Sequence, residues 1–201
     1  MALPMRKEEL KYTYGDYLHW PEGERWEIID GVAYDMSPAP TGKHQEIVGE
    51  LHRQLANYLQ GKPCHAYIAP YDVILPEAGE DAEDSETVVQ PDIAVICDRS
   101  KRTPRGCVGA PDMVIEILSP STSKKDMKEK KALYERAGVR EYWIVQPDEK
   151  WVLIYTRDKD GKFCSHDTFT SDDTPYVHTL PGLQIDLSLV FADYEIEGET
   201  E

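Results

Sequence analysis

The sequence predicts an α/β (α+β) fold in which a mixed central β-sheet is flanked by helices. Short apolar runs rich in β-branched residues recur along the chain, separated by turn dipeptides. Two longer segments, 43–60 and 123–138, carry apolar residues at helical spacing. The resulting order is an N-terminal hairpin, a helix, three strands, a helix, a strand pair and a C-terminal β-meander, which favours a helix-covered sheet. With 201 residues, we expect a single domain over residues 1–201.

The N-terminal part is expected to form a short helix over residues 8–20, followed by the hairpin. Asp30-Gly31 is a strong two-residue turn signal between the apolar runs of RWEIIDGVAYDM. Glu27 lies on the first strand of this hairpin, where alternation alone favours a polar side chain that points outward. A role in a site is the alternative for this carboxylate.

The helix over residues 43–60 is predicted from a regular apolar stripe that includes Ile47, Leu51 and Leu55. His44 falls on the first turn of this stripe. A histidine at such a position is either a satisfied core or edge residue, or a functional group.

Two strands are predicted next, over residues 65–75 and 88–97, joined by the acidic loop 77–87. Asp92 enters the second strand directly after Pro91, where it either caps the strand or presents a carboxylate. A loop over residues 99–110 then carries Arg99, Lys101, Arg102 and Arg105. This loop is either simply solvated or faces phosphates.

The strand over residues 113–118 places a carboxylate, Glu116, among apolar side chains. A near-continuous apolar run of this length is typical of a strand buried on both faces. An ionised carboxylate there costs several kcal/mol unless it is paired or binds a metal. The sequence therefore predicts a partner for Glu116.

A lysine on the following helix is the cationic candidate. Ser123 and Asp126 form a plausible capping box, and Gly138 is a C-terminal capping signal. Lys130 lies four residues before Tyr134, which places it on the apolar stripe of this helix. The alternative is a lysine whose stem covers the core while its ammonium reaches water.

The chain after this helix predicts the meander. Apolar strands at 141–145 and 151–157 are followed by the turn Asp160-Gly161 and a further strand, and a last apolar segment spans 183–191.

Composition indicates a globular protein, because 40% of the residues are hydrophobic and 30% are charged. No apolar run approaches the ~20 residues of a membrane span, and the N-terminus lacks a signal-peptide core. Four cysteines, Cys64, Cys97, Cys107 and Cys164, show no metal-ligand spacing. We therefore expect a cytoplasmic protein with reduced thiols and no membrane partner.

The net charge of −16 disfavours a surface that coats nucleic acid in general. Eleven of the acids lie in the loop 77–87 and the tail 193–201, which we expect to be mobile. Without them the net charge is −5, so the objection to a phosphate-bearing substrate is weaker.

Carboxylates on neighbouring strands, with a lysine on the next helix, indicate a hard, oxygen-binding cation such as Mg²⁺, with Mn²⁺ as a possible substitute. A metal held by two acids lowers the pKa of bound water and stabilises charge on a phosphoryl oxygen. A nearby lysine can orient that water or neutralise developing charge.

The chain resembles the Uma-two family of restriction-endonuclease-like proteins, within the PD-(D/E)XK nuclease superfamily. The matching segments are WEIIDG, KHQEIVGEL, QPDIAV, VIEILSPST and the run from Asp126 to LYERAGVREYWIV. They cover most of residues 12–190. The resemblance implies a core of a helix, a three-stranded antiparallel sheet, a second helix and a further strand.

The resemblance also implies roles for individual residues. Asp92 and Glu116 resemble the two acids of the superfamily motif, and the family pattern places Glu27 near the site and His44 on the first core helix. The usual lysine two residues after the second acid is replaced by Leu118, and Lys130 is the expected substitute.

We therefore expect a metal-dependent phosphodiesterase, a DNA endonuclease, with RNA as an alternative substrate. In this hypothesis Asp92, Glu116 and the carbonyl of Ile117 bind Mg²⁺, and Lys130 helps to activate water. Glu27 aids metal or water binding, and His44 contacts phosphate or tunes the site. The alternative is a catalytically inactive nuclease fold that acts as a binding or assembly module. Exposed aromatic residues around 12–20 and the long meander suggest a homodimer.

Overall fold

The strands form two sheets in the computed structural model, which describes residues 11–21, 23–36, 40–119 and 126–192. Among these residues the small sheet has the strand order β2–β1–β5–β4–β7 and the large sheet the order β11–β10–β9–β8–β6–β3. The small sheet contains β1 (Trp26–Ile29), β2 (Val32–Asp35), β4 (Asp72–Ile74), β5 (Val88–Val89) and β7 (Gly106–Val108). The large sheet contains β3 (His65–Ile68), β6 (Ile93–Ile96), β8 (Met113–Ile117), β9 (Glu141–Gln146), β10 (Trp151–Arg157) and β11 (Phe163–Thr170).

The helices are few and short apart from one. They are α1 (Tyr14–Tyr17), α2 (Gly42–Leu59), α4 (Lys131–Ala137) and α5 (Leu187–Val190), with a π-helical turn η3 (Asp126–Lys130) before α4 and the 3₁₀ turns η1 (Ala82–Asp84) and η2 (Arg99–Lys101). Within the described residues, no helix is both long and apolar enough to cross a membrane.

The core arrangement implied by the resemblance is confirmed. Helix α2 is followed by β3, β6 and β8, which pair antiparallel, and then by α4 and β9, which runs parallel to β8. Strands β10 and β11 extend this sheet as the predicted antiparallel meander. The fold class is therefore as expected, with the difference that the hairpin β1–β2 belongs to a second sheet.

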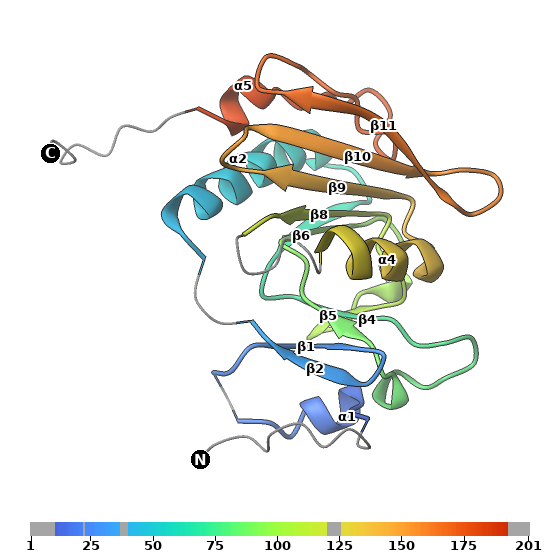
Figure 1. The fold of residues 1–201 in the computed structure, drawn as a ribbon. Helices are drawn as coiled ribbons and strands as arrows, with labels where there is room; N and C mark the ends of the chain where they lie inside the picture. The colour runs from blue at the N-terminus through green and yellow to red at the C-terminus, as the bar shows by residue number, and fades with distance from the viewer. Residues whose placement is uncertain (1–10, 22, 37–39, 120–125, 193–201) are drawn as a thin grey trace, which may run out of the picture.

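Helices cover both faces of the large sheet (Figure 1). Helix α2 packs on one face through Leu51 and Leu55, and α4 lies on the other face, between the two sheets. Successive side chains of β8 alternate between these faces. Ile115 contributes to the core under α2, whereas Val114 contributes to the core under α4. Glu116 therefore points toward α4 and the small sheet.

Two predicted strands are each divided between the sheets. The segment 65–75 splits into β3 and β4, and the segment 88–97 splits into β5 and β6. Pro70 and Pro91 lie at the two breaks, where a residue without a backbone N–H cannot continue a ladder. These crossovers carry the chain from one sheet to the other.

Other expectations differ in extent. The N-terminal helix is limited to α1 among the described residues, and part of the last apolar segment is the helix α5. The loop 77–87 contains η1 and is held by backbone hydrogen bonds from Tyr14 N to Ser85 O and from Gly31 N to Glu86 O. The acidic tail 193–201 and Ser123 lie outside the described residues.

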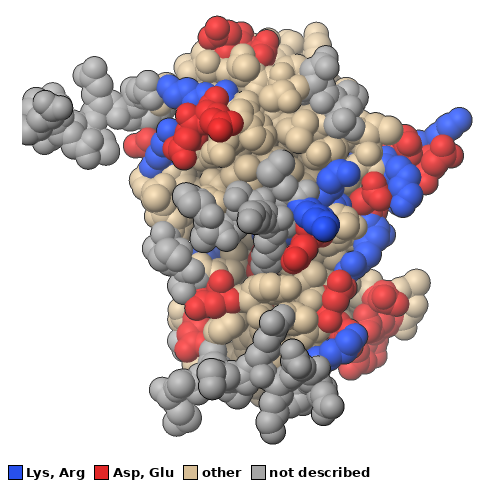
Figure 2. Space-filling view, viewed as in Figure 1, with Lys and Arg blue, Asp and Glu red and all other residues tan. Residues whose placement is uncertain are grey.

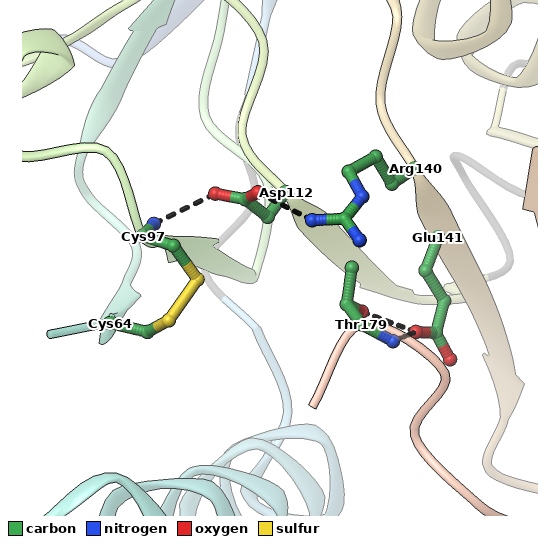
Figure 3. The surroundings of a disulfide bond; sticks show 6 residues. All are labelled: Cys64, Cys97, Asp112, Arg140, Glu141 and Thr179. Carbon is green, nitrogen blue, oxygen red and sulfur yellow. Dashed lines mark hydrogen bonds and ion pairs between the residues drawn. A yellow bond between two sulfur atoms is a disulfide. The ribbon is translucent and has the colours of Figure 1, made fainter. Parts of the chain in front are cut away.

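The expectation of reduced thiols is wrong for two of the four cysteines, because Cys64 and Cys97 form a disulfide (Figure 3). The antiparallel register of β3 and β6 pairs His65 with Ile96, so the cysteines just beyond these positions face each other. Asp112 accepts a hydrogen bond from the Cys97 N–H at 2.7 Å. Cys107 and Cys164 remain free thiols.

Candidate active site

The carboxylate of Glu116 is buried, and one of its oxygens accepts hydrogen bonds from two side chains. Its residue is 4% exposed, and its Oε1 accepts hydrogen bonds from Lys130 Nζ at 2.8 Å and from Tyr134 Oη at 2.7 Å. Both donors come from the helical segment that follows β8. The predicted cationic partner of Glu116 is therefore Lys130.

Helical geometry brings Lys130 and Tyr134 to the same carboxylate. Lys130 ends the π-helical turn and Tyr134 lies one turn later in α4, so both side chains share a face. Lys130 is only 3% exposed, so its ammonium does not reach into water. A π-helical turn is rare and is frequent at functional sites.

Glu27 completes a buried charge cluster across the two sheets. Its Oε1 lies 2.8 Å from Lys130 Nζ and accepts a hydrogen bond from the Gln90 N–H at 3.1 Å. The expectation of an outward side chain is wrong, because Glu27 is only 2% exposed. Strand β1 of the small sheet points this carboxylate at the large sheet, so one ammonium lies between two carboxylates.

Asp92 lies in the turn directly before β6, next to the β8 strand that carries Glu116. The β6–β8 register pairs Ile93 with Ile115, which places Asp92 opposite Glu116. Its Oδ2 accepts a hydrogen bond from the Ile117 N–H at 2.7 Å, and its side chain is 19% exposed. Its Oδ1 accepts no hydrogen bond from the residues that the structure describes. Asp92 is thus the more accessible acid of the site.

His44 approaches Asp92 from the N-terminal turn of α2. Thr41 caps this helix by accepting a hydrogen bond from the His44 N–H, and His44 Nε2 lies 3.3 Å from Asp92 Oδ2. The other ring nitrogen of His44, Nδ1, is buried and has no hydrogen-bond partner among the described residues. The five predicted side chains therefore form two contact groups, Glu27–Lys130–Glu116 and His44–Asp92, which lie side by side because Asp92 binds the backbone N–H that follows Glu116.

The sequence interpretation missed two residues of this cluster. In the sequence, Tyr134 was interpreted only as an apolar residue of the helix stripe. Its position four residues after Lys130 also predicts that both side chains contact the same partner, Glu116. Burial, and next the charge of Glu116, raises the pKa of Tyr134 well above its ordinary value, so its hydroxyl remains a donor. The role of Gln90 depends on a backbone N–H, for which the sequence carries no signal.

Leu118 fills the place of the usual motif lysine with hydrocarbon. It is buried in the core under α4, on the same face as Glu116. The ammonium thus reaches Glu116 from the helix rather than from the strand.

The oxygen atoms of this site are of the kind that binds a hard divalent cation. Asp92 Oδ1, the Glu116 carboxylate and the Ile117 carbonyl are oxygen donors, and Mg²⁺ commonly takes one or two carboxylates and keeps several waters. No group of three or more His, Cys, Asp or Glu side chains within the described chain is arranged to hold a metal ion. A site of this kind would therefore use a carbonyl and waters besides two acids.

Comparisons with known proteins identify the family and a shared fold. The chain is 28% identical over 154 residues to "Uncharacterized protein slr1290" of Synechocystis sp., covering 75% of this chain and 77% of the relative. A crystal structure described as a "putative nuclease belonging to DUF820" from Anabaena variabilis superposes with a TM-score of 0.70 at 24% identity. That match covers 89% of this chain and 97% of the other, and shows a shared fold. The model of the Uma2 family, described as "Putative restriction endonuclease", matches residues 14–188, and the chain therefore belongs to this family.

Proposed function

We propose that this protein is a metal-dependent nuclease that hydrolyses phosphodiester bonds of DNA. The observation that carries this proposal is the buried ammonium of Lys130 between Glu27 and Glu116, beside the accessible carboxylate of Asp92. The family description and the nuclease-like neighbour support the same class of reaction.

Each residue has a role in this proposal. Asp92, Glu116 and the Ile117 carbonyl would hold Mg²⁺, which lowers the pKa of a bound water and stabilises charge on the phosphoryl oxygens. Lys130 orients the attacking water and neutralises charge, while Glu27 and Tyr134 fix the direction of its ammonium and its partner carboxylate. His44 holds Asp92 in place and can donate a hydrogen bond to a phosphate oxygen.

The negative charge of the protein does not form a continuous surface that would repel nucleic acid on every face. Figure 2 shows acidic and basic side chains interspersed on the face that carries α4, rather than one continuous acidic field. The net charge of −16 is therefore compatible with local contact to a polyanion.

Plasmid cleavage with Mg²⁺ or Mn²⁺ tests the proposal, with the variant Asp92→Asn as the probe. Asp92 is partly exposed, so the isosteric amide removes the charge with little effect on packing. We expect a loss of at least about 100-fold in rate, because the metal site loses a charged ligand. Asp160→Asn, a change at an exposed turn position, is the matched control. Equal cleavage by both variants and the wild type would refute the assignment.

A binding or assembly module is the second candidate, because the charges of Glu27, Lys130 and Glu116 are already paired with one another. Calorimetric titration with Mn²⁺ separates the two proposals. Micromolar binding that Glu116→Gln abolishes supports the enzyme, and no binding near neutral pH supports the module. Parallel assays with RNA and single-stranded DNA define the substrate.

The homodimer also stays a prediction. The aromatic residues near the N-terminus contact one another, with Trp20 edge-on to both Tyr17 and Trp26. Light scattering coupled to size-exclusion chromatography would decide the oligomeric state.

A further inference from the structure

A loop that follows β6, at the opposite end of this strand from Asp92, concentrates positive charge. This segment, residues 99–106, is called the basic loop below and carries Arg99, Lys101, Arg102 and Arg105. None of these four cations forms an ion pair with an acid in the described part of the chain. Several cations elsewhere do, for example Arg136 with Asp30. The basic loop is therefore a cluster of cations that form no salt bridges among the described residues.

The basic loop is held in a defined shape. Thr103 N donates to Gly106 O at 2.8 Å, and Thr103 Oγ1 accepts from Gly106 N at 3.0 Å. Tyr71 Oη donates to the same Gly106 carbonyl at 2.7 Å. Burial raises the pKa of Tyr71 to about 12, so this donor persists at all ordinary pH values. Little ordering is then needed when a ligand binds.

One buried N–H group of the basic loop lacks a hydrogen-bond acceptor. Arg102 Nε is buried and makes no hydrogen bond within the described residues. Buried polar groups are nearly always satisfied, so an orphan donor calls for an unseen acceptor or a side chain that turns toward a ligand. A phosphate oxygen is the acceptor that matches a guanidinium best.

Two connections link the basic loop to the site. Tyr71, which anchors the loop, stacks face to face on Tyr67 at 4.2 Å, and Ala69 N between them donates to Asp92 O at 3.1 Å. Gln90 Nε2 donates to Asp72 Oδ1 at 2.8 Å, and the Gln90 N–H holds Glu27. The loop and the site thus share one supporting framework.

The acids near the basic loop are already occupied. Asp98 accepts hydrogen bonds from the N–H and hydroxyl of Ser100, and Asp72 accepts from Gln90. The loop itself, residues 99–106, carries four cations and no acid.

We propose that the basic loop is a docking surface for DNA. It would bind the phosphodiester backbone of a DNA molecule whose cleaved bond lies in the active site. This inference rests on the proposed nuclease function. It adds a segment that binds the substrate at a distance from the residues that cleave it. The charge of the loop is complementary to a polyanion, and the two exposed arginines, Arg99 and Arg105, make the outer contacts.

Fluorescence anisotropy with a short labelled DNA duplex, in the presence of EDTA, tests the docking surface without cleavage. We expect the double variant Arg99→Ala/Arg105→Ala to weaken binding at least about tenfold. The slope of log affinity against log salt should fall by about 1.8, since each lost phosphate contact removes about 0.9. The control is Lys62→Ala/Lys159→Ala, which removes the same charge from exposed positions elsewhere and should change affinity less than about twofold.

The outcomes separate this inference from the proposed function. Equal weakening by the two double variants would show a general charge effect and overturn the docking surface. Unchanged binding by Arg99→Ala/Arg105→Ala, while Asp92→Asn abolishes cleavage, would overturn the docking surface alone. A wild-type protein that neither binds nor cleaves DNA would overturn both.

Discussion

At the scale of residues, the site is defined by one ammonium that lies between two carboxylates. Burying an ionised group costs several kcal/mol, and the contacts of Lys130 with Glu27 and Glu116 offset this cost only while all three are present. The cluster is therefore both a candidate catalytic group and a structural requirement.

Replacement of the ammonium should destabilise the protein strongly. We expect Lys130→Met to lower the free energy of unfolding by about 3–5 kcal/mol, because two buried carboxylates lose their cation. Urea unfolding at neutral pH measures this change. Lys128→Met, an exposed position in the same π-helical turn, is the control and should change stability by less than about 0.5 kcal/mol. Similar effects of both variants would contradict the pairing.

Removal of one hydroxyl should have a smaller effect. Tyr134→Phe keeps the ring in the core and deletes the donor to Glu116, so we expect a loss of about 1.5–3 kcal/mol. Tyr155→Phe is the matched control, since no hydrogen bond of its hydroxyl is found within the described chain. Thermal unfolding of both variants gives the comparison, and a neutral Tyr134→Phe would show that the hydrogen bond contributes nothing.

At the scale of elements, two glycines behave in opposite ways. A Cβ on Gly49, within α2, meets no atom within 4 Å, whereas a Cβ on Gly106 would lie 2.2 Å from the Asp72 carbonyl oxygen. The first glycine only weakens a helix, and the second permits the close approach of β7 to β4.

Alanine at these positions should therefore change stability with opposite sign. We expect Gly49→Ala to raise the free energy of unfolding by about 0.5–1 kcal/mol through helix propensity. Gly106→Ala should lower it by about 1–3 kcal/mol, because backbone must shift. Denaturant unfolding of each variant provides the test, in which stabilisation by both would exclude the close approach.

The pairing of β3 with β6 predicts the reactivity of the thiols. In the unreduced native protein, iodoacetamide should label the exposed Cys164 and spare Cys107, since burial raises the pKa of the Cys107 thiol to about 12. Cys64 and Cys97 should become labelled only after reduction. Mass spectrometry of the peptides shows the pattern, and labelling of Cys64 before reduction would exclude the disulfide.

The sequence was informative where a single element carried the signal. A carboxylate inside an apolar run identified Glu116, and helical spacing brought Lys130 to it. The division of two segments at Pro70 and Pro91 could not be foreseen, because periodicity does not state to which sheet a strand belongs. The disulfide was missed for the same kind of reason, since it depends on the register between two strands.

At the scale of the whole molecule, the charge cluster joins the two sheets. Glu27 belongs to the small sheet, Glu116 to the large sheet, and Lys130 to the helical segment between them. We therefore expect the sheets to unfold as one cooperative unit.

Native-state hydrogen exchange tests this expectation. Amides of Ile28 in the small sheet and Ile115 in the large sheet should exchange with the same free energy of opening in the wild type. In Lys130→Met, Ile28 should open at a lower free energy than Ile115, because the link between the sheets is lost. Independent opening in the wild type would show that the cluster does not couple them.

The location of Lys130 between two layers has a practical consequence for enzymology. We expect preparations of variants at Glu27, Glu116 or Lys130 to contain fewer folded molecules, so a low specific activity reports first on how much folded protein survives purification. Turnover numbers become comparable only after titration of the competent fraction, and Asp92, the most exposed of the three acids, is the position at which that correction is smallest.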